Sequence, residues 1–319
     1  MGWAYLTVPF SFTKIRMNGV FFMSKWNKHA IKANQFAKHQ HLFRCPLCSQ
    51  PMRMVECKSL LCTNQHCYDL SKHGYVHLSS RAYKTKYDKQ LFASRRRMCN
   101  SGFFDPLNEA MTNHLMEFMK PLPGRTIHHY LLDAGCGEGS HLSHIQEKLT
   151  RRGISELTGV GMDVSKEGIA AASKTYPHPL WCVADLAHCP FANQQFDGIL
   201  NILSPSNYAE FTRVLSEEGC ILKVIPEQCY LEELRYLYKQ NKNMPVYSND
   251  NTVSRFKEHF KLLNAERVTY RFALNADLIE PLIHMTPLSW GATEADWHRV
   301  KEMNLTHITI DLLILCGKK

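Results

Sequence analysis

A group of cysteine and histidine residues near the start of the chain has the spacing of metal ligands. Cys45 and Cys48 form a C-x2-C pair, and after a spacer of thirteen residues Cys62 and His66 follow as C-x3-H. Two-residue gaps allow both thiolates of a pair to reach one ion, and four N/S ligands are typical of a closed tetrahedral zinc site. Since such a site has no coordination position for water, the spacing predicts a structural Zn²⁺.

Other cysteines nearby leave the ligand choice open on spacing alone. Cys57 and Cys67 lie in the same segment, and Cys67 adjoins His66, so a site of four thiolates is also chemically acceptable. A further alternative is that these are ordinary buried or free thiols. We expect a reduced, cytoplasmic protein because no secretory signal is recognisable, and in that compartment clustered cysteines bind metal more often than they form disulfides.

A second group of residues has the pattern of a nucleoside-binding loop. An apolar stretch leads through Asp133 into Gly135, Gly137 and Gly139, which form a G-x-G-x-G loop that lets the backbone pass close to a ligand. Dinucleotide-binding folds have G-x-G-x-x-G instead, with a helix N-terminus aimed at a pyrophosphate. The early third glycine favours S-adenosylmethionine, which carries no phosphate.

Two further acids strengthen this interpretation. Asp163 lies thirty residues after Asp133 at the end of the next apolar stretch, where a carboxylate can accept both ribose hydroxyls. Asp185 and Leu186 end the stretch after that, at a position that can meet an adenine edge. A single Asp often only caps a helix or turn. Three acids at successive strand ends instead predict a methyl-donor site, because doubly wound sheets bind ligands there.

The elements that must position these residues alternate between two periods. Apolar residues recur every four positions over 106–120 and predict an amphipathic helix. Predicted strands follow at 130–133, 157–163, 180–184, 196–203 and 220–225, with predicted helices at 141–151, 166–176, 208–215 and 231–239, and strand-like runs at 267–274 and 306–315. Repeated βα units predict an α/β, Rossmann-like fold of the class I methyltransferase type, with a mostly parallel sheet.

Charge is divided unevenly along the 319 residues. The first 100 hold 17 Lys and Arg against 3 Asp and Glu, a net charge of +14, whereas the whole chain carries +9. A basic block on a mildly acidic body predicts a nucleic-acid partner, although a solvated tail is the alternative. Within this block we expect Arg95, Arg96 and Arg97 to bind backbone phosphates. No apolar run reaches the roughly 18 residues of a membrane span, so we expect no membrane partner.

These features divide the chain into four predicted parts. Residues 1–40 form a basic, acid-free arm with no sustained period and no assigned structure. A zinc-binding module at 41–80 and a basic connector at 81–105 follow, and the S-adenosylmethionine-dependent methyltransferase domain covers 106–319. The module is too small for a substantial core, so metal binding should largely fold it.

From about residue 44 onward the chain resembles the RlmA family of 23S rRNA (guanine-N1)-methyltransferases. The segments that carry the resemblance are CPLC at 45–48, CTNQH at 62–66, DLSKHGYV at 69–76, DAGCGEG at 133–139, GMDVSK at 161–166 and HMTPLSW at 284–290. The resemblance implies methyl transfer to N1 of a guanine of the G745 or G748 type in a 23S ribosomal RNA hairpin loop. It also implies a homodimer.

The resemblance further implies site residues. It places the zinc ligands on Cys45, Cys48, Cys62 and His66. It places the cofactor contacts on Phe104, His141, Leu142, Asp163 and Tyr230. Phe104 stands where the family can have Tyr, and Tyr230 where it can have His, so stacking would replace or shift a hydrogen bond at these positions.

The segment after the fourth predicted strand supplies the candidates for the acceptor side. Rossmann methyltransferases usually present target-side residues there, and Asn201 and Ser204 are polar side chains of this segment. The alternative is turn chemistry, for which Asn and Ser are common. The residue pattern identifies no catalytic base for removing the guanine N1 proton.

Two other functions are compatible with these features. A zinc-containing methyltransferase could act on another substrate, because a fold alone does not determine function. A zinc-dependent RNA-binding or assembly factor could keep the fold without catalysis. The basic N-terminal region disfavours a small-molecule substrate, and measurable cofactor turnover would exclude the non-catalytic factor.

Overall fold

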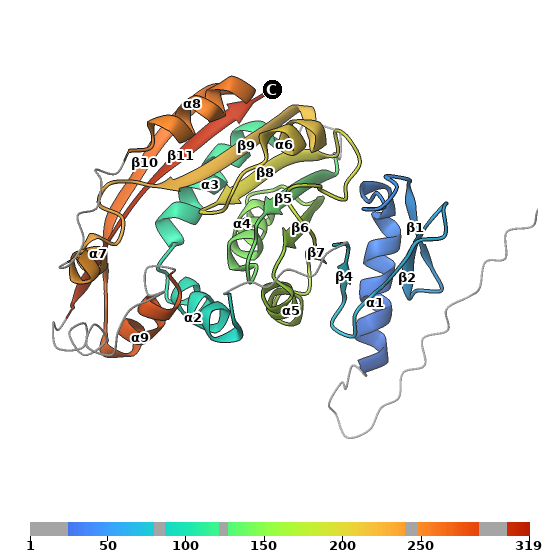
Figure 1. Cartoon of the computed structure of the whole chain (residues 1–319), viewed down its shortest axis with the longest axis horizontal. Coiled ribbons are helices and arrows are strands. Elements are labelled where there is room, and N and C mark those ends of the chain that lie inside the picture. Colours follow the sequence, from blue (N-terminus) through green and yellow to red (C-terminus); the bar gives the residue numbers. More distant parts are fainter. Residues whose placement is uncertain (1–24, 80–86, 121–126, 240–247, 287–304) are drawn as a thin grey trace, which may run out of the picture.

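The computed structural model describes residues 25–79, 87–120, 127–239, 248–286 and 305–319. Residues 1–24 of the predicted arm, 80–86 around the start of the connector, and 287–290 of the HMTPLSW segment lie outside this part. A large α/β unit and a smaller N-terminal unit pack side by side (Figure 1). No helix within the described ranges is long and apolar enough to cross a membrane.

One twisted sheet of eight strands organises the molecule, in the order β10-β11-β9-β8-β5-β6-β7-β4. Its strands are β4 (Tyr75–His77), β5 (His129–Ala134), β6 (Leu157–Asp163), β7 (Leu180–Val183), β8 (Phe196–Ile202), β9 (Leu215–Pro226), β10 (Lys261–Ala273) and β11 (His307–Lys318). The strands from β9 to β4 are parallel to one another. β11 pairs antiparallel with β9, and β10 pairs antiparallel with β11. The predicted doubly wound, mostly parallel sheet is confirmed.

The centre of the sheet is where the ligand crevice of a doubly wound fold is expected. The chain runs outward from β5 through β6 to β7 and then returns to place β8 on the other side of β5. This is a topological switch point, where the loops after β5 and β8 diverge and leave room for a ligand. The glycine-rich loop follows β5, and Ser204 lies just beyond β8.

Helices cover both faces of the sheet, and each face has its own apolar core. They are α3 (Asp105–Phe118), α4 (Ser140–Arg151), α5 (Lys166–Thr175), α6 (Tyr208–Val214), α7 (Glu232–Lys239), α8 (Asp250–His259) and α9 (Ala276–His284). The side chain of Ser165 caps α5 by accepting from the Gly168 amide, and Asn207 caps α6. The sequence pattern predicts neither α8 nor α9. Only Phe256 of α8 is buried, and α9 contains Pro281, so neither helix has a clear pattern in the sequence.

The N-terminal unit is attached to the large sheet by strand pairing. Its three antiparallel strands are β1 (Met52–Val55), β2 (Ser59–Cys62) and β3 (Cys67–Asp69), preceded by α1 (Lys25–Lys38) and a short 3-10 helix, η1 (Gln40–Leu42). The next strand, β4, leaves this small sheet and pairs in parallel with β7. The predicted zinc module is therefore continuous with the edge of the methyltransferase sheet.

Helices also form in two segments for which the sequence predicts none. In the predicted arm, α1 buries Ala33 and Phe36 completely. In the predicted connector, α2 (Lys89–Asn100) is capped by Asp88 and buries Leu91 and Phe92 on one face. Both helices are rich in Lys or Arg. These charged residues mask the helical period in the sequence, because the apolar face of each helix is only two or three residues wide.

Candidate active site and zinc centre

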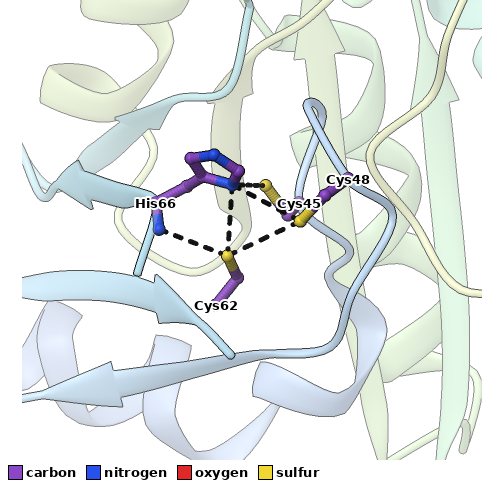
Figure 2. Close-up of side chains that lie close together, drawn as sticks. All are labelled: Cys45, Cys48, Cys62 and His66. Atoms are coloured by element: carbon purple, nitrogen blue, oxygen red, sulfur yellow. Dashed lines mark hydrogen bonds between the residues drawn. The ribbon is translucent and has the colours of Figure 1, made fainter. Parts of the chain in front are cut away.

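Cys45, Cys48, Cys62 and His66 converge on one point (Figure 2). Their ligand atoms all lie within 4.8 Å of one another. His66 Nδ1 is 3.4 Å from each of the three Sγ atoms, and the Sγ atoms of Cys48 and Cys62 are 3.7 Å apart. Zn–S bonds of about 2.3 Å and a Zn–N bond of about 2.0 Å give tetrahedral edges of roughly 3.5–3.8 Å. The donor set therefore fits one zinc ion.

The same geometry answers the ligand question that spacing leaves open. Cys67 and Cys57 are both exposed and do not belong to the cluster, so His66 is the fourth donor. The turn before His66 depends on Gln65, whose backbone adopts a left-handed φ of 63°. The His66 amide donates to the Cys62 sulfur over 3.3 Å, which favours the thiolate form that zinc requires.

The glycine-rich loop after β5 requires glycine for two reasons. Gly135, Gly137 and Gly139 all have positive φ, at 87°, 56° and 85°, where a Cβ is unfavourable. A Cβ on Gly135 would overlap the Ser204 hydroxyl, and one on Gly139 would overlap the Trp181 ring. The loop is therefore closely packed between Ser204, which follows β8, and Trp181 of β7.

Two carboxyl groups frame this loop. Asp163, at the end of β6, accepts hydrogen bonds from the Gly137 amide at 2.9 Å and from the Ser165 amide at 2.7 Å. Asp133 is buried, and its Oδ1 has no hydrogen-bond partner. Burial raises the pKa of Asp133 to about 8, against the opposing charge of Arg95. A buried acceptor without a partner is costly, so its position at the crevice is evidence for a polar ligand.

The predicted contacts on α3 and α4 lie together beneath the loop. The rings of His141 and Phe104 are 4.8 Å apart. His141 Nδ1 lies 2.8 Å from Asn108 Oδ1, while Nε2 has no partner. Burial holds the pKa of His141 well below its usual range, so the ring is neutral. Because Nδ1 donates to the amide oxygen, Nε2 is a buried acceptor, and Leu142 beside it is fully buried.

The remaining predicted donor residues lie around the same crevice. Asp185 is half-buried and accepts from the Ala187 amide at 2.8 Å. The Leu186 side chain reaches within 3.9 Å of the place where a Cβ on Gly135 would lie. Tyr230 follows β9 and is half-buried. It packs against the apolar core that contains Phe104 and Leu142, and burial raises the pKa of its hydroxyl.

Arg95 lies beside the glycine-rich loop, a location that the sequence does not predict. It is predicted to bind RNA phosphates, yet its Nη1 lies 3.9 Å from the position of a Cβ on Gly137. Its charge opposes the burial that raises the pKa values of Asp133 and Asp163. On the same face of α2, Phe92 lies 3.5 Å from the position of a Cβ on Gly137. Residues three apart share a face only on a helix, and the sequence predicts no helix in this segment.

The two acceptor-side candidates have different environments. Asn201 is fully buried and makes four hydrogen bonds: Nδ2 donates to Ala134 O and Pro205 O, and Oδ1 accepts from Ser206 and Lys223. These bonds use the whole capacity of its amide and join β5 to β8 and β9. Ser204 instead lines a cavity of about 410 Å³. Asn201 therefore connects the strands by hydrogen bonds in the interior, whereas Ser204 borders the cavity.

The fold and site define a class I S-adenosylmethionine-dependent methyltransferase with a zinc ribbon. Residues 43–79 match the family model described as "RlmA, N-terminal", a zinc ribbon, and residues 131–222 match a methyltransferase domain. The protein named "Putative 23S rRNA (guanine-N(1)-)-methyltransferase YxjB" of Bacillus subtilis (strain 168) is 41% identical over 280 residues, which cover 87% of this chain and 97% of the relative. The chain belongs to the RlmA family of methyltransferases.

More distant similarities are of the same kind. The 23S rRNA (guanine(748)-N(1))-methyltransferase of Streptomyces fradiae is 27% identical, covering 77% of this chain and 85% of the relative. A crystal structure of a SAM-dependent methyltransferase from Aquifex aeolicus is similar with a TM-score of 0.40 and 15% identity, covering 56% of this chain and 92% of that one.

Proposed function

We propose that this protein transfers a methyl group from S-adenosylmethionine to N1 of a guanine, of the G745 or G748 type, in a hairpin loop of 23S ribosomal RNA. The observation that carries the proposal is one chain with both a Cys/His cluster of zinc-site geometry and two buried acceptors without partners, Asp133 Oδ1 and His141 Nε2. Relatives named for this reaction cover 87% and 77% of the chain and support the substrate. We further propose a cytoplasmic homodimer, as the family resemblance suggests.

The donor would be held by residues at the ends of β5, β6 and β7. When bound, S-adenosylmethionine supplies an electrophilic methyl group on a sulfonium sulfur. Asp163 is placed to accept from ribose hydroxyls, and Asp185 with Leu186 to meet the adenine. Arg95 is placed to bind the carboxylate of the methionine end, while the unpaired Asp133 oxygen can accept from its ammonium group.

The chain's contribution to the chemistry would be position and charge. Guanine N1 would bond the methyl carbon while the carbon–sulfur bond breaks and S-adenosylhomocysteine leaves, and the N1 proton would pass to solvent water. Donors that stabilise negative charge on the base would therefore lower the barrier. Fixing N1 in line with the methyl group turns a bimolecular step into one within the complex. A hairpin-loop guanine suits such a site because it needs less unstacking than a base inside a duplex.

The RNA backbone would be bound by the basic N-terminal third. Its net charge of +14 supplies sequence-independent affinity through counterion release. Arg44, next to the zinc cluster, lines a cavity of about 540 Å³ with His188 from the loop before β8. The zinc ribbon and the methyltransferase domain thus line one cavity together.

The proposal is tested with labelled S-adenosylmethionine and unmodified 23S rRNA, with the product mapped by the reverse-transcription stop that N1-methylguanine causes. The Asp163→Ala variant is the control, because it loses the ribose acceptor. A stop at one guanine of the hairpin, absent in the control, supports the proposal. Labelled RNA with stops elsewhere would overturn the target, and absence of any label despite bound cofactor would overturn the RNA substrate.

A further inference from the structure

The cavity beyond β8 and β9 adjoins the glycine-rich loop 135–139 after β5, here called the donor loop. It has a volume of about 410 Å³ and lies among the ends of these strands and the starts of α6 and α8. Its polar lining consists largely of Ser204, Tyr208, Lys223, Asn249, Thr252 and Arg255. Ser204 contacts the donor loop directly, since a Cβ on Gly135 would overlap its hydroxyl. A ligand in this cavity would therefore lie one side chain away from the donor.

Lys223 is the charged group inside this cavity. Its side chain is only 5% exposed, and Nζ donates to Asn201 Oδ1 at 2.6 Å and to the Ser204 carbonyl. An ammonium has three N–H donors. Two are used within the part of the chain that the structure describes, which leaves the third for a ligand.

The charges around the cavity select the kind of ligand. Lys223 at the base and Arg255 at the exposed edge are both cationic, and no Asp or Glu is among the described residues that line it. Burial lowers the pKa of Lys223 to about 8, so the ammonium remains charged at neutral pH at a desolvation cost. A ligand with an electron-rich oxygen would offset that cost, whereas a cation would be repelled.

We infer that this cavity binds the target guanine and that Lys223 donates a hydrogen bond to its O6. The inference rests on the proposed function and adds to it the location of the acceptor base. When N1 loses its proton, negative charge spreads onto O6, so a cationic donor there stabilises the reacting form more than the ground state. Arg255 lies where it can bind an adjacent phosphate, and Tyr208 forms part of the wall.

The test compares two enzymes on two RNAs. The hairpin carries either guanine at the position mapped with the wild-type enzyme or 2-aminopurine, which lacks O6. For the wild-type protein we expect RNA binding, measured by fluorescence anisotropy with S-adenosylhomocysteine present, to weaken about 10-fold or more on loss of O6. For Lys223→Met we expect the two RNAs to bind equally, because the donor to O6 is gone.

A matched control comes from a second buried lysine. Lys32 is 6% exposed, donates to the Pro177 and Pro179 carbonyls, and also has a pKa lowered to about 8, but it does not line this cavity. Lys32→Met should keep the wild-type preference for guanine. An equal loss of preference in both variants, or a full preference retained in Lys223→Met, would overturn the inference even where the wild-type enzyme methylates the guanine.

A cavity-filling variant covers the case in which Lys223→Met does not fold. Thr252 is a half-buried position on α8 that lines the cavity, so Thr252→Trp fills the cavity while Lys223 is retained. We expect the Kd for S-adenosylmethionine to stay within about 2-fold, while the KM for the hairpin rises at least 10-fold. An unchanged KM for RNA would contradict the assignment of the acceptor base to this cavity.

Discussion

At the scale of single residues, the donor site depends on unpaired polar atoms beside a crowded glycine loop. Asp133 and His141 each bury an acceptor without a partner, and Arg95 brings positive charge to the same crevice. Motif spacing marks Asp133 and the glycines in the sequence, whereas His141 is indicated only by the family resemblance. Arg95 and Lys223 are not predictable from the sequence, because a basic run and a lysine in a strand give no sign of the side to which the side chain turns.

Removing the Arg95 charge should weaken cofactor binding selectively. A hydrogen bond to a charged group contributes about 1.5–3 kcal/mol, so Arg95→Met should raise the Kd for S-adenosylmethionine by about 10-fold or more. Isothermal titration calorimetry measures this directly. Arg97→Met, an exposed neighbour on the same helix, should leave the Kd unchanged, and equal effects of the two substitutions would refute a specific role for Arg95.

A comparison of Gly→Ala at two glycines distinguishes the cost of steric overlap from the cost of backbone strain. Gly135 and Gly153 both have positive φ, at 87° and 100°, but nothing lies within 4 Å of a Cβ on Gly153. Gly153→Ala should cost about 1 kcal/mol of unfolding free energy through strain alone. Gly135→Ala should cost clearly more and abolish S-adenosylmethionine binding, as Ser204 must move. Urea unfolding and calorimetry test this, and similar values for both variants would argue against the close approach of Ser204.

At the scale of elements, the sequence predicts the helices and strands that have a regular apolar period, but not the elements that lack one. The βα alternation predicts β5 to β9 and α4 to α6 within a few residues, because each element has a clear apolar face. The sequence contains no comparable sign that β4 joins β7, since that strand is three residues long and its pairing is non-local. The helices α1 and α2 are equally hard to predict, because their surfaces are dominated by basic residues.

The zinc cluster should stabilise more than the ribbon itself, because β4 follows directly from it into the large sheet. Cys62→Ser should reduce bound zinc from about one ion per chain to well below one and lower the Tm, measured by metal analysis and differential scanning fluorimetry. Cys67→Ser, at an exposed cysteine outside the cluster, should change neither quantity. Loss of zinc in Cys67→Ser would contradict the ligand set.

At the scale of the whole molecule, basic and acidic regions are joined through one continuous sheet. The basic side chains that the structure describes within the first 100 residues lie on the ribbon, α1 and α2, and these elements pack at the edge of the sheet and beside the glycine-rich loop. The topology therefore brings positive charge close to this loop, which composition alone cannot reveal. Charge predicts the kind of partner, whereas only the topology relates that partner to the chemistry.

Stability should fall on acidification because of the neutral buried His141. Its folded pKa is depressed below 6.5, so below that pH the unfolded chain binds a proton that the folded chain does not, and stability declines as pH falls. At pH 5 the loss reaches up to about 2 kcal/mol for this residue. The decline in Tm between pH 7 and pH 5 should be smaller in His141→Gln, and an equal decline would refute the contribution of His141. Acid effects on the zinc site are common to both proteins and cancel.

Methylation of guanine at N1 is tested by identifying the modified nucleoside itself. Unmodified 23S rRNA is incubated with the zinc-loaded protein and S-adenosylmethionine, digested to nucleosides, and analysed by liquid chromatography and mass spectrometry against standards of the isomeric methylguanosines. The account predicts N1-methylguanosine at up to one mole per mole of RNA, and none with Asp163→Ala. Methylation of another guanine atom or another base would contradict it.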